Sequence, residues 1–126
     1  MRASADEARD AWVDDWSWRL MRWTLAVPLV FHGLWNLSAV GETWWVASSG
    51  LPPLLRWVVG PAELAAALAF GIGVQVRLAA ALLVPVMLGA VQQHLAQGSS
   101  FKHGGWETPL AYAMLAAALA LRPPRR

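Results

Sequence analysis

The chain has 126 residues, enough for one domain, and 57% of them are hydrophobic while only 14% are charged; a soluble domain has about 25% charged residues. It contains no cysteine, which excludes disulfides, a thiolate nucleophile and a cysteine-ligated metal. The formal net charge is +2, and the basic residues form no face or stripe of the kind that indicates nucleic-acid binding.

The N-terminal segment, residues 1–19, is acidic and only weakly apolar. It lacks the basic start and short apolar core of a cleaved signal peptide. Trp12 and Trp16 are four residues apart, so they share one face of a helix, and tryptophan favours the membrane interface. Residues 5–18 are therefore expected to form a helix that lies on the membrane, docks a partner, or is a solvated lead-in.

Four apolar runs follow, and the first three are close to the roughly 17–25 residues that a helix needs to cross a bilayer. The runs cover residues 20–40, 56–74, 78–96 and 107–121, with turn-rich pieces at 41–53, 73–77 and 97–105 between them. A soluble helical bundle is the alternative, but so few charges leave little to form its surface. The sequence predicts a single all-α domain over 1–126, an integral membrane four-helix bundle.

Lysine and arginine are distributed unequally between the two sides of this predicted bundle. With four spans, both termini and the 73–77 turn share one side, which carries Arg2, Arg9, Arg19, Arg22, Arg77, Arg122, Arg125 and Arg126, whereas Arg56 and Lys102 lie on the other. Basic residues favour the cytoplasmic side, so both termini are expected in the cytoplasm. Arg77 is expected to reach the headgroups there and to pin the tight turn.

Glu63 is the single carboxylate in the second apolar run, WVVGPAELAAALAFGIGV. It lies roughly 10 Å below the outer edge at 1.5 Å per residue. Because a buried charge is costly in a membrane, such a residue usually faces the bundle interior. Pro61 suits the first turn of a helix, which would place Glu63 in that turn after a broken or re-entrant lead-in at 54–60. Glu63 is then either a functional carboxylate or a hydrogen-bonding tie between helices.

Other polar side chains gather in the same outer half of the bundle. His32 lies near the middle of the first span, with Asn36 one turn later on the same face. His94 ends the third span, and Trp106 and Glu107 open the fourth. Each has an ordinary structural role as well: packing histidine, interhelical amide, headgroup contact or solvated loop. The tryptophans Trp44, Trp45, Trp57 and Trp106 are expected in the outer interfacial belt.

Metal and haem binding are not expected. Histidine and glutamate are metal-ligand types, but no predicted helix carries an HxxxH or ExxH pair. His32 and His94 are predicted to differ in depth by about 10 Å at 1.5 Å per residue, which disfavours a shared haem.

Several pieces of the sequence, taken in order, resemble the DoxX family. They are FHGLWNL, VGPAELAAALAFGIGVQVRLAAALL, VMLGAVQQH and GGWETPL, and they cover about residues 30–121. The resemblance implies a four-helix protein of the inner (plasma) membrane, associated with redox systems such as quinone-linked oxidation of sulfur compounds and oxidant defence. It marks His32, Gly60, Glu63, Arg77, His94, Trp106 and Glu107 as family-type positions. Many members carry a lysine shortly after the His-Gly pair, where this chain has Asn36 and Leu37, so Glu63 must pair differently.

Two classes of function follow. In the first, the chain is a membrane subunit of a quinone-linked or other respiratory redox complex, in which Glu63 and His32 are catalytic and bind quinone oxygens or relay protons. The residues expected to hold the quinone are His94, Asn36, Trp106, Glu107 and Met87. In the second, it is a structural subunit that anchors a larger membrane complex, or a small transporter or lipid-binding protein. Expected partners are the lipid bilayer, other protein subunits and a quinone, and whether the chain is an enzyme by itself stays open.

Overall fold

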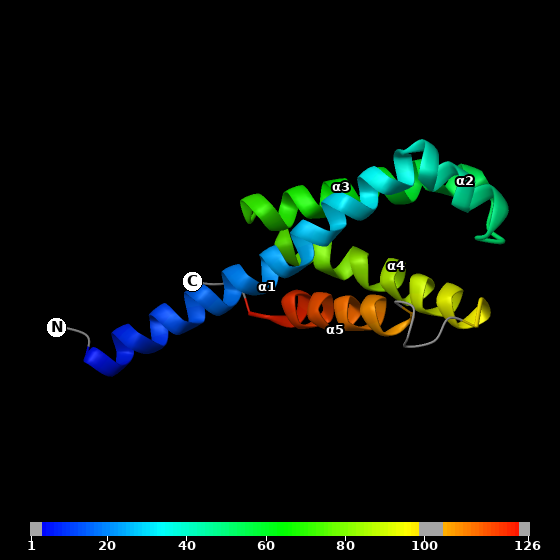
Figure 1. Cartoon of the computed structure of the whole chain (residues 1–126). Coiled ribbons are helices and arrows are strands. Elements are labelled where there is room, and N and C mark those ends of the chain that lie inside the picture. Colours follow the sequence, from blue (N-terminus) through cyan, green and yellow to red (C-terminus); the bar gives the residue numbers. More distant parts are fainter. Residues whose placement is uncertain (1–3, 99–104, 124–126) are drawn as a thin grey trace.

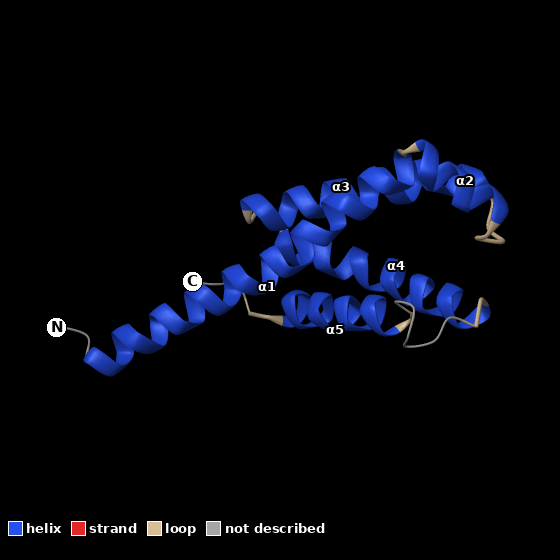
Figure 2. Cartoon of the chain, in the orientation of Figure 1, coloured by secondary structure: helices blue, strands red, loops and turns tan. Residues whose placement is uncertain are grey.

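The computed structural model describes residues 4–98 and 105–123 (Figure 1, Figure 2). Its elements are α1 (Ala5–Leu37), α2 (Ala39–Ala47), the 3-10 helix η1 (Pro53–Leu55), α3 (Arg56–Ile72), α4 (Val76–Ala96) and α5 (Glu107–Leu121). The described residues contain no strand, which confirms the all-α class. Four residues counted for the orientation lie outside the described part of the chain: Arg2, Lys102, Arg125 and Arg126.

Helix α1 begins with a capping box and projects beyond the other helices (Figure 1). The Ser4 hydroxyl accepts a hydrogen bond from the Glu7 N–H at 3.2 Å, and the Glu7 carboxylate accepts one from the Ser4 N–H at 2.7 Å. These bonds satisfy two N–H groups at the helix start. The expected helix over 5–18 is therefore the first half of α1, and it exposes Trp12 and Trp16.

The chain bends sharply where α1 ends. The Ser38 hydroxyl accepts a hydrogen bond from the Gly41 N–H at 3.1 Å and so caps α2. The break between α1 and α2 bends the chain by 74°. The predicted first span, residues 20–40, is therefore interrupted at Ser38.

The four long helices pack as two pairs, α1 beside α3 and α4 beside α5 (Figure 1). Contacts of α3 with α4 and of α1 with α5 join the pairs. Apolar side chains from all four helices meet in one buried core, among them Leu25, Phe70, Leu83 and Leu119. α2 and η1 lie together at one end of the molecule.

Helix α3 begins at Arg56 and continues through Pro61, so the predicted start near Pro61 is wrong. Pro53 is the first residue of η1, which leads directly into α3 and supplies the proline-led start that was assigned to Pro61. A proline inside a helix removes one backbone hydrogen bond, and α3 tolerates that loss. Glu63 consequently lies inside the helix rather than in its first turn.

Two arginines bind the ends of neighbouring helices. Arg22 of α1 donates to the carbonyl oxygens of Phe70 at 2.9 Å and Gly71 at 3.2 Å, at the end of α3. Arg77 of α4 donates to the Ala120 carbonyl oxygen, at the end of α5, at 3.1 Å. A cation there complements the last carbonyls of a helix. Arg22 thus binds the end of α3 just before the turn at 73–77, whereas the described contact of Arg77 is with α5. That Arg77 reaches the headgroups stays a prediction.

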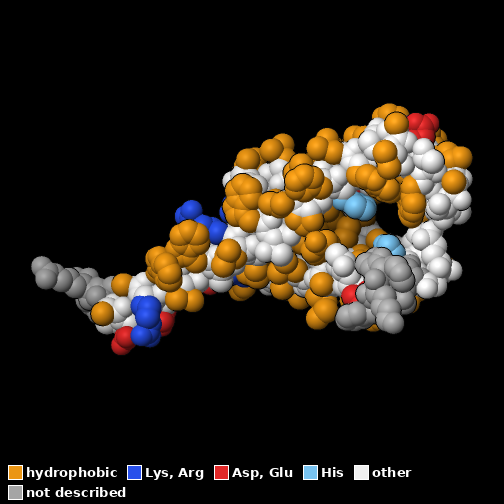
Figure 3. Space-filling view, viewed as in Figure 1, with side chains coloured by type: hydrophobic (Ala, Val, Ile, Leu, Met, Phe, Trp, Pro, Cys, Tyr) orange, Lys and Arg blue, Asp and Glu red, His pale blue; other side chains and the backbone are white. Residues whose placement is uncertain are grey.

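The outer surface identifies a helical membrane protein. Two segments are long and apolar enough to cross a bilayer, Pro53–Ile72 and Val76–Ala96, and the bent pair α1–α2 also qualifies if it is one span. α5 is apolar but has only 15 residues. Large hydrophobic side chains cover much of the visible surface (Figure 3), far more than a soluble monomer exposes.

Candidate functional site

The site forms where α1 and α3 approach each other at two glycines. A Cβ atom on Gly33 would lie 2.8 Å from Leu64 Cγ and 2.9 Å from the Gly60 carbonyl oxygen. A Cβ on Gly60 would lie 2.9 Å from Leu37 Cγ. Small residues allow such close packing of membrane helices. The contact brings Glu63, which is 2% exposed, against the polar face of α1.

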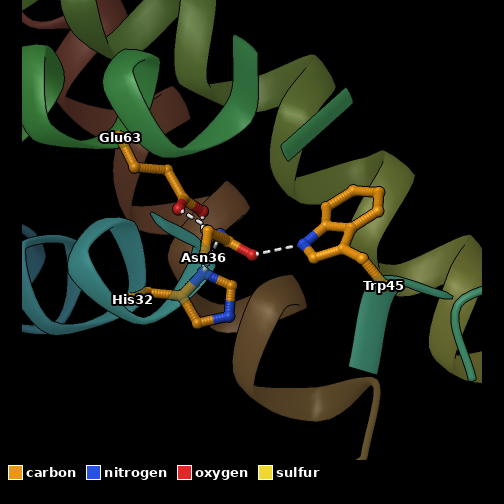
Figure 4. Close-up of polar contacts among 4 residues, drawn as sticks. All are labelled: His32, Asn36, Trp45 and Glu63. Atoms are coloured by element: carbon orange, nitrogen blue, oxygen red, sulfur yellow. Dashed lines mark hydrogen bonds and ion pairs between the residues drawn. The ribbon is translucent and has the colours of Figure 1, made fainter. Parts of the chain in front are cut away.

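A chain of hydrogen bonds links Trp45, Asn36 and Glu63 (Figure 4). The Trp45 indole N–H donates to Asn36 Oδ1 at 2.7 Å. An indole N–H can only donate, so this oxygen is the acceptor end of the amide. The opposite end of the amide, Asn36 Nδ2, therefore donates to Glu63 Oε2 at 2.8 Å.

The tautomer of His32 depends on the same carboxyl group. Its Nδ1 lies 2.8 Å from Glu63 Oε1. An ionised carboxylate only accepts, so Nδ1 carries the hydrogen when Glu63 is ionised. The 3.4 Å approach of Asn36 Nδ2 to the same Nδ1 then joins two donors and is no bond. In the neutral ring, Nε2 is left as an acceptor, and Figure 4 shows it on the side of the ring away from Glu63.

A cavity of about 340 Å³ lies between the two helix pairs, beside this network. The residues that line it on α1 and α3 include His32 and Glu63; those on α4 and α5 include Met87, His94 and Tyr112. Figure 3 shows a dark hollow flanked by two histidine patches. Such a volume, with mostly apolar walls and a few polar groups, is at the small end of ligand sites.

A second cavity, of about 290 Å³, lies between α3 and α4 and meets the first at Glu63. Apart from Glu63 and Gln75, its walls are alanine, leucine and valine side chains, among them Ala65, Ala66 and Leu82. One buried carboxylate therefore borders both a polar and an apolar space.

Most of the predicted site residues come together here. His32, Glu63, Met87 and His94 line one cavity. Because α1 crosses the α4–α5 pair obliquely (Figure 1), residues predicted at different depths along their own helices can border the same space. Asn36 is in the hydrogen-bond network behind the cavity.

Trp106 and Glu107 lie beside the cavity rather than on its wall. Their neighbours Gly105 and Thr108 line it. Oε1 of Glu107 is buried, and none of the described residues forms a hydrogen bond with it. Within residues 4–98 and 105–123, no three histidine, aspartate or glutamate side chains are grouped so that they could hold a metal ion.

Two contributors were not predicted as site residues. Trp45 was assigned to the interfacial belt, but it is 5% exposed and holds the Asn36 amide. Ser38 and Gly41 have the spacing of a helix cap within an apolar run. This is the sequence signal for the bend that brings Trp45 next to Asn36. Tyr112 lies on the cavity wall. In the sequence it stands within an apolar helix, and nothing there marks it as a site residue.

Buried Arg56, at the start of α3, was also unexpected. It pairs with Glu42 of α2 at 3.0 Å and stacks over the Trp57 ring at 4.6 Å. Its charge is therefore compensated by α2, on the outer face of the bend, and it takes no part in the network around Glu63.

Comparison with known proteins gives one match. The family model of DoxX matches residues 17–96, which includes α2, α3, α4 and most of α1 but not the GGWETPL piece. None of the curated proteins and none of the solved structures compared with the chain gives a significant match. The matched range holds His32, Asn36, Trp45, Glu63 and His94. With well over half of its length matched, the chain belongs to the DoxX family.

Proposed function

We propose that this protein is a membrane subunit of a quinone-linked redox system and that the cavity between the helix pairs takes the quinone ring. The observation that carries the proposal is the relay from Trp45 through Asn36 and Glu63 to His32. Its first three members are buried, and the side chain of His32, at its end, is 58% exposed and lines the cavity. With Glu63 ionised, one imidazole nitrogen is left there as a proton acceptor.

The expected chemistry is proton exchange at His32 Nε2. When a quinol is oxidised, each hydroxyl loses a proton. Nε2 takes one of them while the Glu63 carboxylate stabilises the imidazolium, and the other proton passes to water. The two electrons pass to a redox cofactor of a partner subunit. In quinone reduction the same proton returns to the ring oxygen. Met87 and Tyr112 supply apolar and aromatic contacts to the ring.

The apolar cavity between α3 and α4 favours a lipophilic ligand over a water-soluble one. A ring bound beside Glu63 has this second space adjacent to it, and its alanine and leucine walls suit a hydrocarbon tail. A water-soluble substrate would gain nothing from that space. The proposal therefore names a quinone with an isoprenoid chain.

We also propose that both termini face the cytoplasm, because the basic residues are concentrated at that end. A reporter that is active only outside the cytoplasm should give no signal when it is fused to the C-terminus. The same reporter inserted after Gly50, in the loop between α2 and η1, should be active. A strong signal from the C-terminal fusion would reverse the orientation.

Filling the cavity should weaken quinone binding. Ala90 lines it, and Ala90→Phe places a ring in the space that the ligand needs. We expect the affinity for a short-chain quinone to fall by about tenfold or more, which corresponds to about 1.4 kcal/mol. Quenching of tryptophan fluorescence, titrated with the quinone in mild detergent, measures it.

The matched control is Ala81→Phe. Ala81 is exposed on the same helix and lines neither cavity, so this variant should bind like wild type. Equal affinity of Ala90→Phe and wild type would place the quinone elsewhere. Absence of any bound quinone, with stable co-purification of other chains, would favour the structural-subunit function, for which the projecting first half of α1 is the available surface.

A further inference from the structure

The opposite end of the bundle holds a third cavity, of about 330 Å³, which is basic. It lies between α1, the turn after α3 and the end of α5. Its walls include Trp18, Gly73, Gln75, Arg77 and Arg122. Gln75 also lines the apolar cavity between α3 and α4, whereas the other four residues line neither of the cavities beside Glu63.

Positive charge at this cavity exceeds negative charge. Arg22 lies beside it, because a Cβ on Gly73 would be 2.5 Å from Arg22 Nη1. Arg22 and Arg77 bind backbone carbonyls, which offset only part of each charge. Of these three arginines only Arg122 has a carboxylate partner, Asp14, within the described part of the chain.

Donors remain for a ligand. Arg77 uses Nε for the Ala120 carbonyl, and among the described residues neither of its Nη atoms has a hydrogen-bond partner. Arg122 uses Nη2 for Asp14 and stacks over the Trp18 ring at 5.1 Å. A guanidinium has five N–H donors in a planar fork that suits phosphate oxygens.

We propose that this cavity binds a phosphate group, supplied by the headgroup of an anionic phospholipid. Exposed apolar side chains surround it: Leu78 follows Arg77, Leu121 precedes Arg122, and Val74 lies in the turn. Acyl chains leaving a bound headgroup would run along these side chains. A free phosphate would make no use of them.

The sharpest test changes the charge of Gln75 and leaves every arginine contact in place. Gln75 has a left-handed backbone (φ 53°), which asparagine and aspartate both tolerate. Gln75→Asp puts a carboxylate on the cavity wall, and Gln75→Asn is its neutral match. The full chain in mild detergent is titrated with phosphatidylglycerol, phosphatidylcholine or inorganic phosphate, and native mass spectrometry and the melting temperature report binding.

Wild type and Gln75→Asn should bind phosphatidylglycerol in preference to phosphatidylcholine, and Gln75→Asp should bind it about tenfold more weakly because of charge repulsion. Arg122→Gln should also weaken binding. If only inorganic phosphate stabilises the protein, the cavity binds phosphate, but the phosphate does not come from a lipid headgroup. Equal phosphatidylglycerol binding by Gln75→Asp and Gln75→Asn, or no preference over phosphatidylcholine, would overturn the proposal.

Discussion

Replacing Gly41 by alanine should displace α2 from α1 and destabilise the protein in detergent by about 1–3 kcal/mol, the range for overpacking a close contact. A Cβ on Gly41 would overlap the carbonyl oxygen of Trp35 and lie 3.1 Å from the Asn36 Cα. Both obstacles are backbone atoms of α1, so no side chain can move aside. α2 must shift, and the Trp45 indole would then leave Asn36. Thermal unfolding and the tryptophan emission spectrum measure the two effects.

Gly89→Ala is the matched control. Gly89 lies in α4, and a Cβ there meets nothing within 4 Å. Alanine is the better helix former by about 1 kcal/mol, so this variant should be as stable as wild type or more stable. If Gly41→Ala melts with the control, the tight bend between α1 and α2 is wrong, and so is the placement of Trp45.

That Glu63 faces polar side chains inside the bundle could be predicted, because a buried carboxylate in a membrane needs a polar neighbour. The missing lysine after the His-Gly pair required another partner for Glu63. The structure supplies His32 and Asn36 in its place.

The contacts between distant segments could not be predicted in the same way. Arg22 and Phe70 are far apart in the sequence, yet Arg22 binds the end of α3, a contact that was not predicted. Both arginines lie at the same end, so charge counting cannot tell which helix end each one binds. The choice depends on which helices pack against each other. The spacing of apolar residues does not predict this pairing when the outer surface of the bundle is apolar as well as its core.

The bend at Ser38 shows how one local feature changes a site. An uninterrupted span over 20–40 would carry Trp45 out to the interface, as predicted. The cap and Gly41 turn α2 back instead, and Trp45 becomes the donor that orients Asn36. That orientation in turn directs the Asn36 amide N–H at Glu63 Oε2. One hydrogen bond of the buried carboxyl group is therefore set by a residue on a different helix.

Glu63→Gln should leave the fold almost unchanged and invert the hydrogen-bonding role of His32. The amide oxygen of the introduced glutamine can accept from Asn36, but its amide nitrogen then faces His32 Nδ1 as a donor. The neutral ring must accept at Nδ1 and carry its hydrogen on Nε2, so the cavity-facing nitrogen can no longer take a proton. Stability should change by only about 0.6 kcal/mol, the average for a hydrogen bond between membrane helices. Proton exchange with a bound quinol should fall by about 10²–10⁴-fold, the usual contribution of a general base.

Two measurements on Glu63→Gln separate this result from a merely structural role of Glu63. The ¹⁵N chemical shifts of His32, assigned with a His32→Gln variant, report which ring nitrogen is protonated and need no ligand. Binding assays compare quinol with quinone: wild type should favour the quinol, whose hydroxyl donates to Nε2, and Glu63→Gln should favour the quinone, whose carbonyl accepts from it. Glu7→Gln, in the capping box far from the cavity, should change neither. An unchanged His32 tautomer in Glu63→Gln, or wild-type quinol preference, would leave Glu63 as a tie between α1 and α3 and favour the structural-subunit function.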